Sequence, residues 1–231
     1  MVIDQRKCIG CHTCAIACTI ENNAPKNVQL NKTITDNGGL NMDTPSGGCL
    51  GSTTTAATFA DPGVKMSYYT RACQHCDEHP CTSVCPTGAT FTKDGAVEMD
   101  YSLCIDCGNC ISACPYGDVR VSYKDKEWYT DFDLGDPSSP KRYDQEKGYM
   151  IVSKCTFCQH LRAAGKNPAC VDVCPGRARF VGDINDTGSA VYRMVYGPDS
   201  RGGQRQFQTV AEVENVDTSA TGAPGVYILK P

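Results

Sequence analysis

The chain has 231 residues, and 22 Lys and Arg against 26 Asp and Glu give it a formal net charge of −4. This charge excludes the basic surface typical of nucleic-acid-binding proteins, and no apolar run reaches the ~18 residues that a membrane helix requires. The apolar fraction of 40% includes 17 cysteines, so the other apolar residues alone would build an undersized core. Because patterned sequence begins at Met1, we expect no cleavable leader.

The first of four cysteine groups follows a short strand predicted at residues 1–4. Three of its cysteines fall within seven residues and the fourth comes soon after. The group consists of Cys8, Cys11, Cys14 and Cys18. Residues 29–65 are rich in Asn, Thr, Gly and Asp, and we expect a surface insertion there. This segment contains Cys49, which stands outside every group and which we interpret as a free or incidental thiol.

The next two groups are joined by residues 86–103, a segment just long enough for a β-hairpin. The second group consists of Cys73, Cys76, Cys81 and Cys85, and the third, spaced like the first, of Cys104, Cys107, Cys110 and Cys114. Strands are predicted at 90–91 and 96–99, with Asp94-Gly95 as the turn. The three-residue gap before each fourth cysteine suits a short helical turn. Residues 66–125 are therefore predicted to form one compact unit.

The fourth group follows a connecting loop predicted at residues 126–145. That region contains Trp128, Tyr129 and Phe132, for which a packed loop is favoured over a surface that contacts a partner. A strand at 149–152 leads into the group, and residues 179–181 return as a strand. The group consists of Cys155, Cys158, Cys170 and Cys174. The C-terminal extension, 191–231, is predicted to end in an edge strand at 226–229.

The spacing of the cysteines favours iron–sulfur clusters over two alternatives. A disulfide framework is disfavoured by the odd count and by the strained bridges that two-residue spacings would impose. Zinc is the stronger alternative, but its sites normally separate two Cys-x2-Cys pairs by a longer finger. Three closely spaced cysteines, a fourth and then a proline form the pattern that bacterial ferredoxins use for [4Fe–4S] clusters. The proline is present at Pro86, Pro115 and Pro175, whereas Thr19 replaces it in the first group.

The groups alternate in type, which indicates an internal duplication. The pattern from Asp4 to Cys18 matches that from Asp100 to Cys114, and Cys81–Phe91 matches Cys170–Phe180. Because the second and third groups form one unit, the first and fourth must meet across the chain. We therefore predict an α+β fold of two nested ferredoxin-like double-[4Fe–4S] units, with the surface insertion and the C-terminal extension added. The outer unit consists of residues 1–28 and 146–190, and the inner unit of residues 66–125.

Other polar residues stand near the predicted ligands. The four histidines are His12, His75, His79 and His160. Zinc ligation and proton-coupled tuning of a cluster are alternatives, but hydrogen bonding near sulfur or solvent exposure is favoured because the cysteines already saturate the metals. The flanking cations are Lys7, Arg71, Lys154, Arg177 and Arg179. A positive charge near a cluster raises its reduction potential, and surface solvation accounts for these cations equally well.

The four groups in this order resemble the iron–sulfur electron-transfer (beta) subunits of the DMSO reductase family of molybdenum or tungsten bis-pterin oxidoreductases. The resemblance covers the outer and inner units and includes residues 181–186 (VGDIND) after the fourth group. Nitrate reductase subunits of this kind lack one cysteine of the third group, but Cys107 is present here. The resemblance therefore implies four [4Fe–4S] clusters in a row. It also implies an electron-transfer subunit of anaerobic respiration that is not itself catalytic.

The resemblance further implies the partners of the chain and their positions. A large pterin-bearing catalytic subunit would face the outer unit, and a membrane quinone-reactive or cytochrome subunit would face the inner unit. Such subunits are often exported in folded form with the catalytic subunit, which favours the extracytoplasmic face over the cytoplasm. A soluble polyferredoxin that serves another oxidoreductase, such as a hydrogenase, is the alternative. Since no catalytic constellation, phosphate loop or dinucleotide fingerprint is present, no catalytic residue is predicted.

In two-cluster ferredoxins the fourth cysteine of each run binds the neighbouring cluster. Three cysteines on one short loop wrap one face of a cubane, while the fourth, a helical turn later, points towards the neighbour. Applied to this chain, the rule predicts four sets of ligands. Set 1 consists of Cys8, Cys11, Cys14 and Cys174; set 2 of Cys18, Cys155, Cys158 and Cys170; set 3 of Cys73, Cys76, Cys81 and Cys114; and set 4 of Cys85, Cys104, Cys107 and Cys110.

Overall fold

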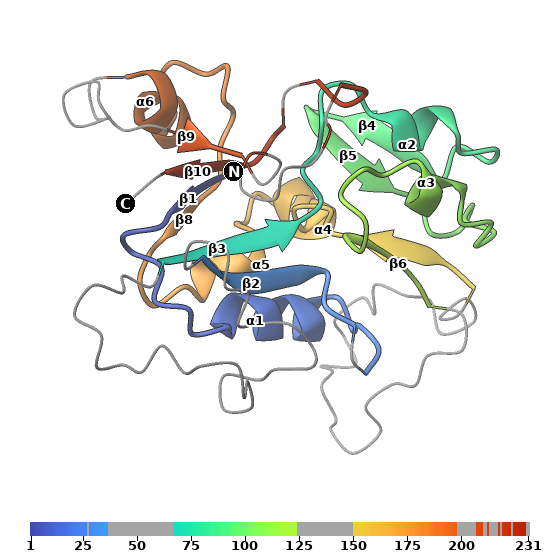
Figure 1. Cartoon of the computed structure of the whole chain (residues 1–231), viewed down its shortest axis with the longest axis horizontal. Helices are drawn as coiled ribbons and strands as arrows, with labels where there is room; N and C mark the ends of the chain where they lie inside the picture. Colours follow the sequence, from blue (N-terminus) through green and yellow to red (C-terminus); the bar gives the residue numbers. More distant parts are fainter. Residues whose placement is uncertain are drawn as a thin grey trace.

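The computed structural model of the chain has an α+β fold built from short elements (Figure 1). It describes residues 1–26, 28–36, 67–123, 150–197, 207–209, 212, 217, 219–222 and 224–229. The strands are β1 (Val2–Asp4), β2 (Asn31–Asp36), β3 (Ser67–Ala72), β4 (Thr90–Lys93), β5 (Ala96–Met99), β6 (Arg120–Ser122), β7 (Val152–Lys154), β8 (Arg179–Phe180), β9 (Phe207–Gln208) and β10 (Tyr227–Leu229). The helices are α1 (Thr13–Glu21), α2 (Pro80–Ser83), α3 (Asn109–Ser112), α4 (Gln159–Ala163), α5 (Ala169–Asp172) and α6 (Ala190–Tyr196). None of the helices in these ranges is long and apolar enough to cross a membrane.

The two ends of the chain lie together in one sheet of strand order β8-β1-β10-β9 (Figure 1). Strand β1 pairs antiparallel with β8 and parallel with β10. The N-terminal ammonium of Met1 donates a hydrogen bond of 2.7 Å to the carbonyl oxygen of Gly225. On one side of the sheet, Val191 and Val195 of α6 pack against the buried Val2 and Leu229. The last strand therefore holds the first strand in place.

The prediction of an edge strand at 226–229 was wrong in one respect. Strand β10 does form there, but it lies inside the sheet between β1 and β9, and Ile228 is fully buried. The neighbour on its outer side, β9, has only two residues. Such a short strand shows no alternation of apolar and polar residues from which it could be recognised in the sequence.

The predicted hairpin between the second and third groups is confirmed. Strands β4 and β5 pair antiparallel with Lys93 opposite Ala96. Asp94 and Gly95 form the two-residue turn with φ angles of 48° and 70°, and positive values at both central residues are those of a type I′ turn. By contrast, β7 begins at Val152, later than the strand predicted at 149–152.

Part of the predicted surface insertion is a strand with one buried side, formed by Asn31 and Thr33. Residues 31–36 form β2, which pairs antiparallel with β3 along six residues, and the pair crosses the middle of the molecule (Figure 1). Leu30 and Asn31 are each 2% exposed. This strand was not predicted from the sequence, because its buried residues Asn31 and Thr33 are polar. The rest of the insertion, with Cys49, and the loop with Trp128 lie outside the described residues.

The helices carry the third cysteine of every group and, in the first group only, also the fourth. Helices α2, α3 and α5 have four residues each, and they contain Cys81, Cys110 and Cys170 respectively. Helix α1 is longer and places Cys14 and Cys18 four positions apart, on one side. Helix α1 packs against α5, and α2 packs against α3. The first group therefore contacts the fourth, and the second contacts the third.

We expect Ile228→Ala to destabilise the cluster-loaded protein by roughly 2–5 kcal/mol, because the substitution leaves a cavity where Ile228 packs against Tyr69, Tyr116 and Val119. The measurement is the denaturant midpoint of unfolding. Ile16→Ala is the matched control, since Ile16 is 59% exposed and exposed positions usually change stability by less than ~0.5 kcal/mol. Equal shifts in the two variants would contradict an interior position for β10.

Candidate functional site: four sets of cysteine thiols

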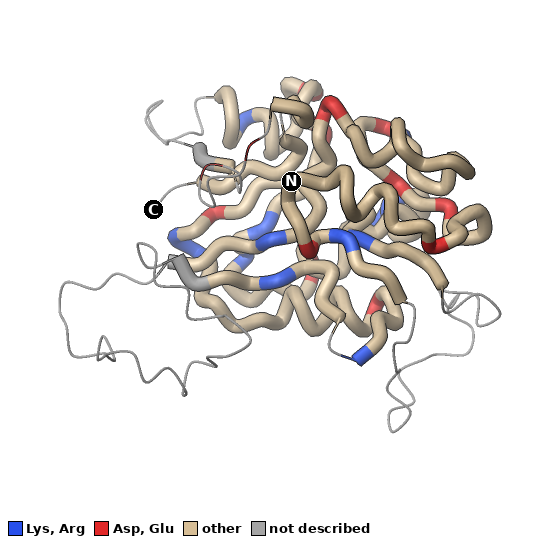
Figure 2. The backbone as a smooth tube through the Cα atoms, turned by 45° about the vertical axis from the view of Figure 1, so that its right-hand side comes forward, with Lys and Arg blue, Asp and Glu red and all other residues tan. Residues whose placement is uncertain are grey.

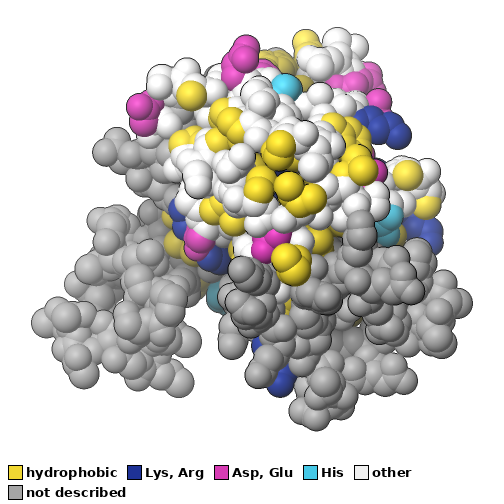
Figure 3. All heavy atoms as spheres, turned by 90° about the vertical axis from the view of Figure 1, so that its right-hand side faces the viewer, with side chains coloured by type: hydrophobic (Ala, Val, Ile, Leu, Met, Phe, Trp, Pro, Cys, Tyr) yellow, Lys and Arg dark blue, Asp and Glu magenta, His cyan; other side chains and the backbone are white. Residues whose placement is uncertain are grey.

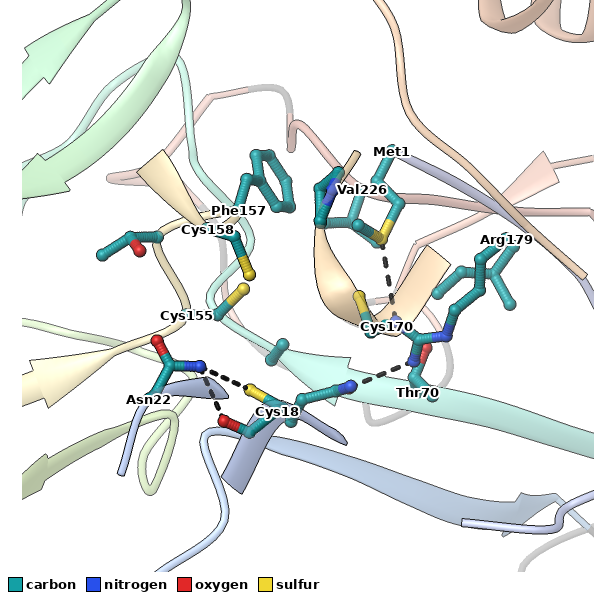
Figure 4. A pocket seen from close by; sticks show the side chains of 15 residues that line it. Met1, Cys18, Asn22, Thr70, Cys155, Phe157, Cys158, Cys170, Arg179 and Val226 are labelled. Carbon is teal, nitrogen blue, oxygen red and sulfur yellow. Dashed lines mark hydrogen bonds between the residues drawn. The ribbon is translucent and has the colours of Figure 1, made fainter. Parts of the chain in front are cut away.

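The thiols of set 2 line one pocket, drawn in Figure 4. Cys18 reaches it from α1, Cys170 from α5, and Cys155 and Cys158 from the loop after β7. The amide nitrogen of Asn22 donates to the Cys18 sulfur at 3.3 Å and to the Cys18 carbonyl oxygen at 2.7 Å. Thiols separated by more than a hundred residues in the sequence thus surround one space.

Two further pockets are lined by the thiols of sets 3 and 4. The pocket with set 3 contains Cys73, Cys76, Cys81 and Cys114. The pocket with set 4 contains Cys85, Cys104, Cys107 and Cys110. In the first, Cys114 comes from the third group and the other three thiols from the second. In the second, Cys85 is the single thiol from the second group. The backbone N–H of Val152 donates to the Cys104 sulfur at 3.3 Å.

Three thiols of set 1 are also close neighbours. Burial raises the pKa of Cys8 most, the backbone N–H of Gly10 lowers it, and the thiols of Cys14 and Cys174 raise it further. Cys11 is exposed, and a hydrogen bond of 3.3 Å from Thr13 Oγ1 lowers its pKa. The backbone N–H of Ala178 donates to the Cys174 sulfur at 3.3 Å. Cys174, from the fourth group, therefore lies beside the first group.

Residues with left-handed backbone conformation shape every cysteine loop. The residues with positive φ angles in these loops include Gly10, His12, His75, Asp106, Gly108, Phe157 and Cys158. Tight turns of this kind direct successive backbone N–H groups to one side and form a concavity suited to an anion. Gly10 is also required for space, because a Cβ there would lie 2.5 Å from the Tyr68 ring. An iron–sulfur cluster with four thiolates is such an anion, so the loops fit it.

The thiols within a set repel one another's ionised forms. Burial is the largest cause that raises the pKa of Cys76 to about 12, and the neighbouring thiols of Cys73, Cys114 and Cys81 raise it as well. Burial and the thiol of Cys170 likewise raise the pKa of Cys155 to about 12, against an opposing backbone hydrogen bond from Phe157. Such thiols ionise only when a metal supplies positive charge. Soft thiolate donors in sets of four are the ligands of iron–sulfur clusters.

The structure gives the histidines partners that sequence reasoning did not identify. His75 is buried, its ring stacks on Phe157 at 3.6 Å, and its Nδ1 accepts the backbone N–H of Val97. His160 Nε2 lies 2.5 Å from Glu21 Oε1. In the described parts of the chain, no three His, Cys, Asp or Glu side chains converge on a point that could hold a single metal ion. The four thiols of a set share a pocket instead.

The cations near the sets fall into two kinds. Lys7 lies over the Phe180 ring, and Arg71 pairs with Asp118 at 2.6 Å. Lys154 and Arg179, by contrast, are buried. A third buried cation, Arg120 of β6, lines the pocket of set 3 and was not predicted from the sequence. It stands ten residues after Cys110, outside the groups, and only the strand pairing brings it to the site.

Two family models match the chain. One described as a 4Fe-4S dicluster domain matches residues 64–131 and 121–184, and one described as a 4Fe-4S binding domain matches residues 6–24. The chain is 40% identical to the iron-sulfur subunit of a putative dimethyl sulfoxide reductase of Halobacterium salinarum, over 84% of this chain and 70% of that protein. It is 33% identical to an arsenate respiratory reductase iron-sulfur subunit of Shewanella sp., over 84% of this chain and 86% of that protein. It is 34% identical to a selenate reductase subunit of Mesobacillus selenatarsenatis, over 86% of this chain and 64% of that protein.

Ferredoxin-like dicluster domains and grouped thiols define an iron–sulfur protein with an α+β fold. Its relatives narrow the class: the chain belongs to the iron–sulfur electron-transfer subunits of the DMSO reductase family. It is an electron-transfer subunit of a respiratory oxidoreductase and is not itself catalytic. It binds multiple [4Fe–4S] clusters, and its sixteen grouped cysteines are the number that four clusters require.

Exposure differs between the sets and predicts the order in which iron is lost. Cys11 of set 1 and Cys107 of set 4 are exposed, whereas every thiol of sets 2 and 3 is buried or half-buried. We expect an oxidant and a soluble chelator to release about half of the iron from the isolated subunit in a fast phase and the remainder slowly, because solvent reaches exposed thiolates first. Iron release is followed through a coloured chelate. One phase for all the iron would contradict the expected order.

Proposed function

We propose that each of the four sets binds one [4Fe–4S] cluster and that the chain conducts electrons through them in series. One terminus of this path would be a large molybdenum or tungsten bis-pterin catalytic subunit, and the other an external or membrane donor or acceptor. When bound, each cluster would supply the redox chemistry by taking up and releasing one electron. The observation that supports this proposal most directly is that three separate pockets are each lined by four cysteines.

The composition of the pockets supports the crossed assignment of ligands. In each pocket three thiols come from one group and the fourth from another: Cys18 for set 2, Cys114 for set 3 and Cys85 for set 4. Cys174 lies beside Cys8 in the same manner. The packing of α1 on α5 and of α2 on α3 agrees with this exchange. We therefore propose that the outer unit, 1–28 with 146–190, encloses the inner unit, 66–125.

The chain's own residues hold and shield the clusters. Four cysteines at each cluster leave no open coordination position, so substrate would be bound by the catalytic partner and not here. The named relatives belong to reductases of different substrates, dimethyl sulfoxide, arsenate and selenate among them. This diversity supports a shared electron-transfer role. It also favours the reductase subunit over a polyferredoxin that serves a hydrogenase.

The two ends of the proposed path expose apolar side chains suited to partner contacts. On the outer unit, Ile16 and Ile20 lie one turn apart on α1 and are 59% and 45% exposed. On the inner unit, Leu103 and Ile105 are exposed beside set 4. Figure 3 shows hydrophobic side chains gathered on the face that carries α2, α3, β4 and β5. We propose that the outer unit faces the catalytic subunit, the inner unit faces the external partner, and the complex works at the extracytoplasmic side of the membrane.

The function is tested by purifying the chain from cells that also produce its partners. We expect about sixteen irons and sixteen acid-labile sulfides per chain, together with a co-purifying large chain that contains pterin. Ile16→Glu should lower the yield of that chain, because the charge disrupts an apolar contact on the outer unit, whereas Ile105→Glu on the inner unit is the control. Zinc without sulfide, or a subunit that never associates with a pterin-bearing chain, would overturn the proposal. A loss of association in Ile105→Glu alone would reverse the orientation.

Cys18→Ser tests the crossed ligands. Cys18 lies in the pocket with Cys155 although it is close in sequence to Cys8. We therefore expect the electron paramagnetic resonance (EPR) signal of the reduced Cys18→Ser protein to lack or alter the component that Cys155→Ser also alters. The component that Cys8→Ser alters should remain. If Cys18→Ser and Cys8→Ser changed the same component, the fourth cysteine would bind with its own group.

A further inference from the structure

Three cationic side chains are buried among the cysteine sets. Arg179, Lys154 and Arg120 are 6%, 1% and 3% exposed. Figure 2 shows that Lys and Arg positions lie on strands that cross the middle of the molecule. Within the described residues, none of these three cations forms an ion pair with a carboxylate, although other cations do. A buried charge without a counter-charge is strongly unfavourable, so each one needs a negative group nearby.

The two arginines each lie between the two sets of their own unit. Burial lowers the pKa of Arg179, but the thiols of Cys170, Cys14 and Cys155 outweigh it and raise the pKa overall. These thiols belong to sets 1 and 2. Arg179 Nη2 donates to Asn31 Oδ1 at 3.1 Å, and its Nη1 lies 3.9 Å from the Met1 sulfur (Figure 4). The guanidinium is thus fixed at the boundary of the two sets.

Arg120 occupies the corresponding place in the inner unit. Its Nη2 donates to Thr90 Oγ1 at 3.2 Å, and its Nη1 lies 3.8 Å from the Met99 sulfur. Burial lowers the pKa of Arg120, but nearby thiols outweigh it and raise the pKa overall. These thiols are Cys81, Cys73, Cys110 and Cys114. Three of them belong to set 3 and Cys110 to set 4, so this guanidinium also lies between two sets.

Lys154 lies where the two units meet. Its Nζ donates to the Val97 carbonyl of β5 at 2.5 Å and to the Cys155 carbonyl at 2.9 Å. Burial lowers the pKa of Lys154, and the thiol of Cys73 is the largest influence that raises it. The thiols of Cys155 and Cys81 raise it as well, while Arg120 lowers it. Since Cys155 belongs to set 2 and the other two thiols to set 3, the ammonium lies between these sets.

Two more contacts make this junction well defined. His75, in the loop of set 3, stacks on Phe157, in the loop of set 2, with an interplanar angle of 15°. Gln159 of α4 accepts the Met99 N–H at 3.2 Å and donates to the Met99 carbonyl at 2.8 Å. Lys154 also stands directly opposite Arg120 in the β6–β7 ladder. Like charges at such positions destabilise a sheet unless anions lie beside both.

We propose that Arg179, Lys154 and Arg120 separate successive clusters in the order of sets 1, 2, 3 and 4, and that Lys154 is the residue that couples the two double-cluster units. The inference rests on the proposed function, because it takes each set to bind one cluster. A cluster with four thiolates is negatively charged, and a nearby positive charge raises its reduction potential. Lys154 is a positioning residue: its two carbonyl contacts fix the inner hairpin against the loop of set 2, and its charge favours electrons on the two clusters at the junction.

The test is a redox titration of the cluster-loaded full chain, with the reduced clusters followed by EPR. Lys154→Gln removes the charge and keeps a hydrogen-bond donor, and it should lower two of the four midpoint potentials while leaving two unchanged. Lys154→Arg keeps the charge and should restore the two potentials towards those of the unaltered chain. A structural role alone would not distinguish the charged variant from the neutral one.

Arg179→Gln and Arg120→Gln are the matched controls. Each should lower two potentials, the two pairs should have no member in common, and each pair should share one member with the pair lowered by Lys154→Gln. This overlap gives the order of the clusters without assigning any signal. The proposal is overturned if the two arginine variants lower a midpoint potential in common. It is also overturned if Lys154→Gln lowers no midpoint potential, lowers all four, or lowers the same two as one of the arginine variants. If the Lys154→Gln protein loses iron, the proposal requires that Lys154→Arg retain its iron. It also requires that Arg179→Gln and Arg120→Gln still lower two different pairs of potentials, and the proposal fails otherwise. Failure of the proposed function differs, because the unaltered chain would then not show four one-electron steps.

Discussion

The constraint on which this fold depends is the gathering of thiols that repel each other when ionised. Cys76 and Cys155 have pKa values raised to about 12, and burial together with neighbouring thiols is the cause. A chain that must bring such groups together gains stability only when a metal cluster compensates for their charge. The secondary structure contributes little to the stability of the fold, because four-residue helices and two-stranded ladders are only marginally stable in isolation. Cluster binding and folding are therefore expected to be one process.

The exchange of fourth cysteines turns local loops into a tertiary structure. In the proposed scheme each cysteine group supplies the fourth ligand to the cluster of another group. Neither of the two paired groups can therefore form a complete cluster site alone. Strand pairing follows the same logic: β8, next to the fourth group, pairs with β1, which leads into the first. The parallel strand β10 then covers the other side of β1 and ties the C-terminal extension to the start of the chain.

Sequence patterns predicted the features that depend on local spacing. The hairpin around Asp94 and the short helices before the fourth cysteines follow from turn residues and from the distance between ligands. Features that depend on tertiary surroundings were missed. Strand β2 was concealed because Asn31 and Thr33 are buried among sulfur and polar partners and not in an apolar core. Arg120 was missed because only the β6–β7 register places it beside Lys154.

Equivalent positions in the two halves of the duplication stand at opposite ends of a similar hydrogen bond, in which an arginine is the donor each time. Thr90 and Arg179 occupy equivalent positions, nine residues after Cys81 and Cys170. Thr90 accepts a hydrogen bond from Arg120, whereas Arg179 is itself the donor, to Asn31. What the halves share is thus the location of a positive charge and not the residue that carries it. In an alignment of the two halves this charge would occupy different columns, and a column-by-column comparison would score a retained electrostatic feature as a loss.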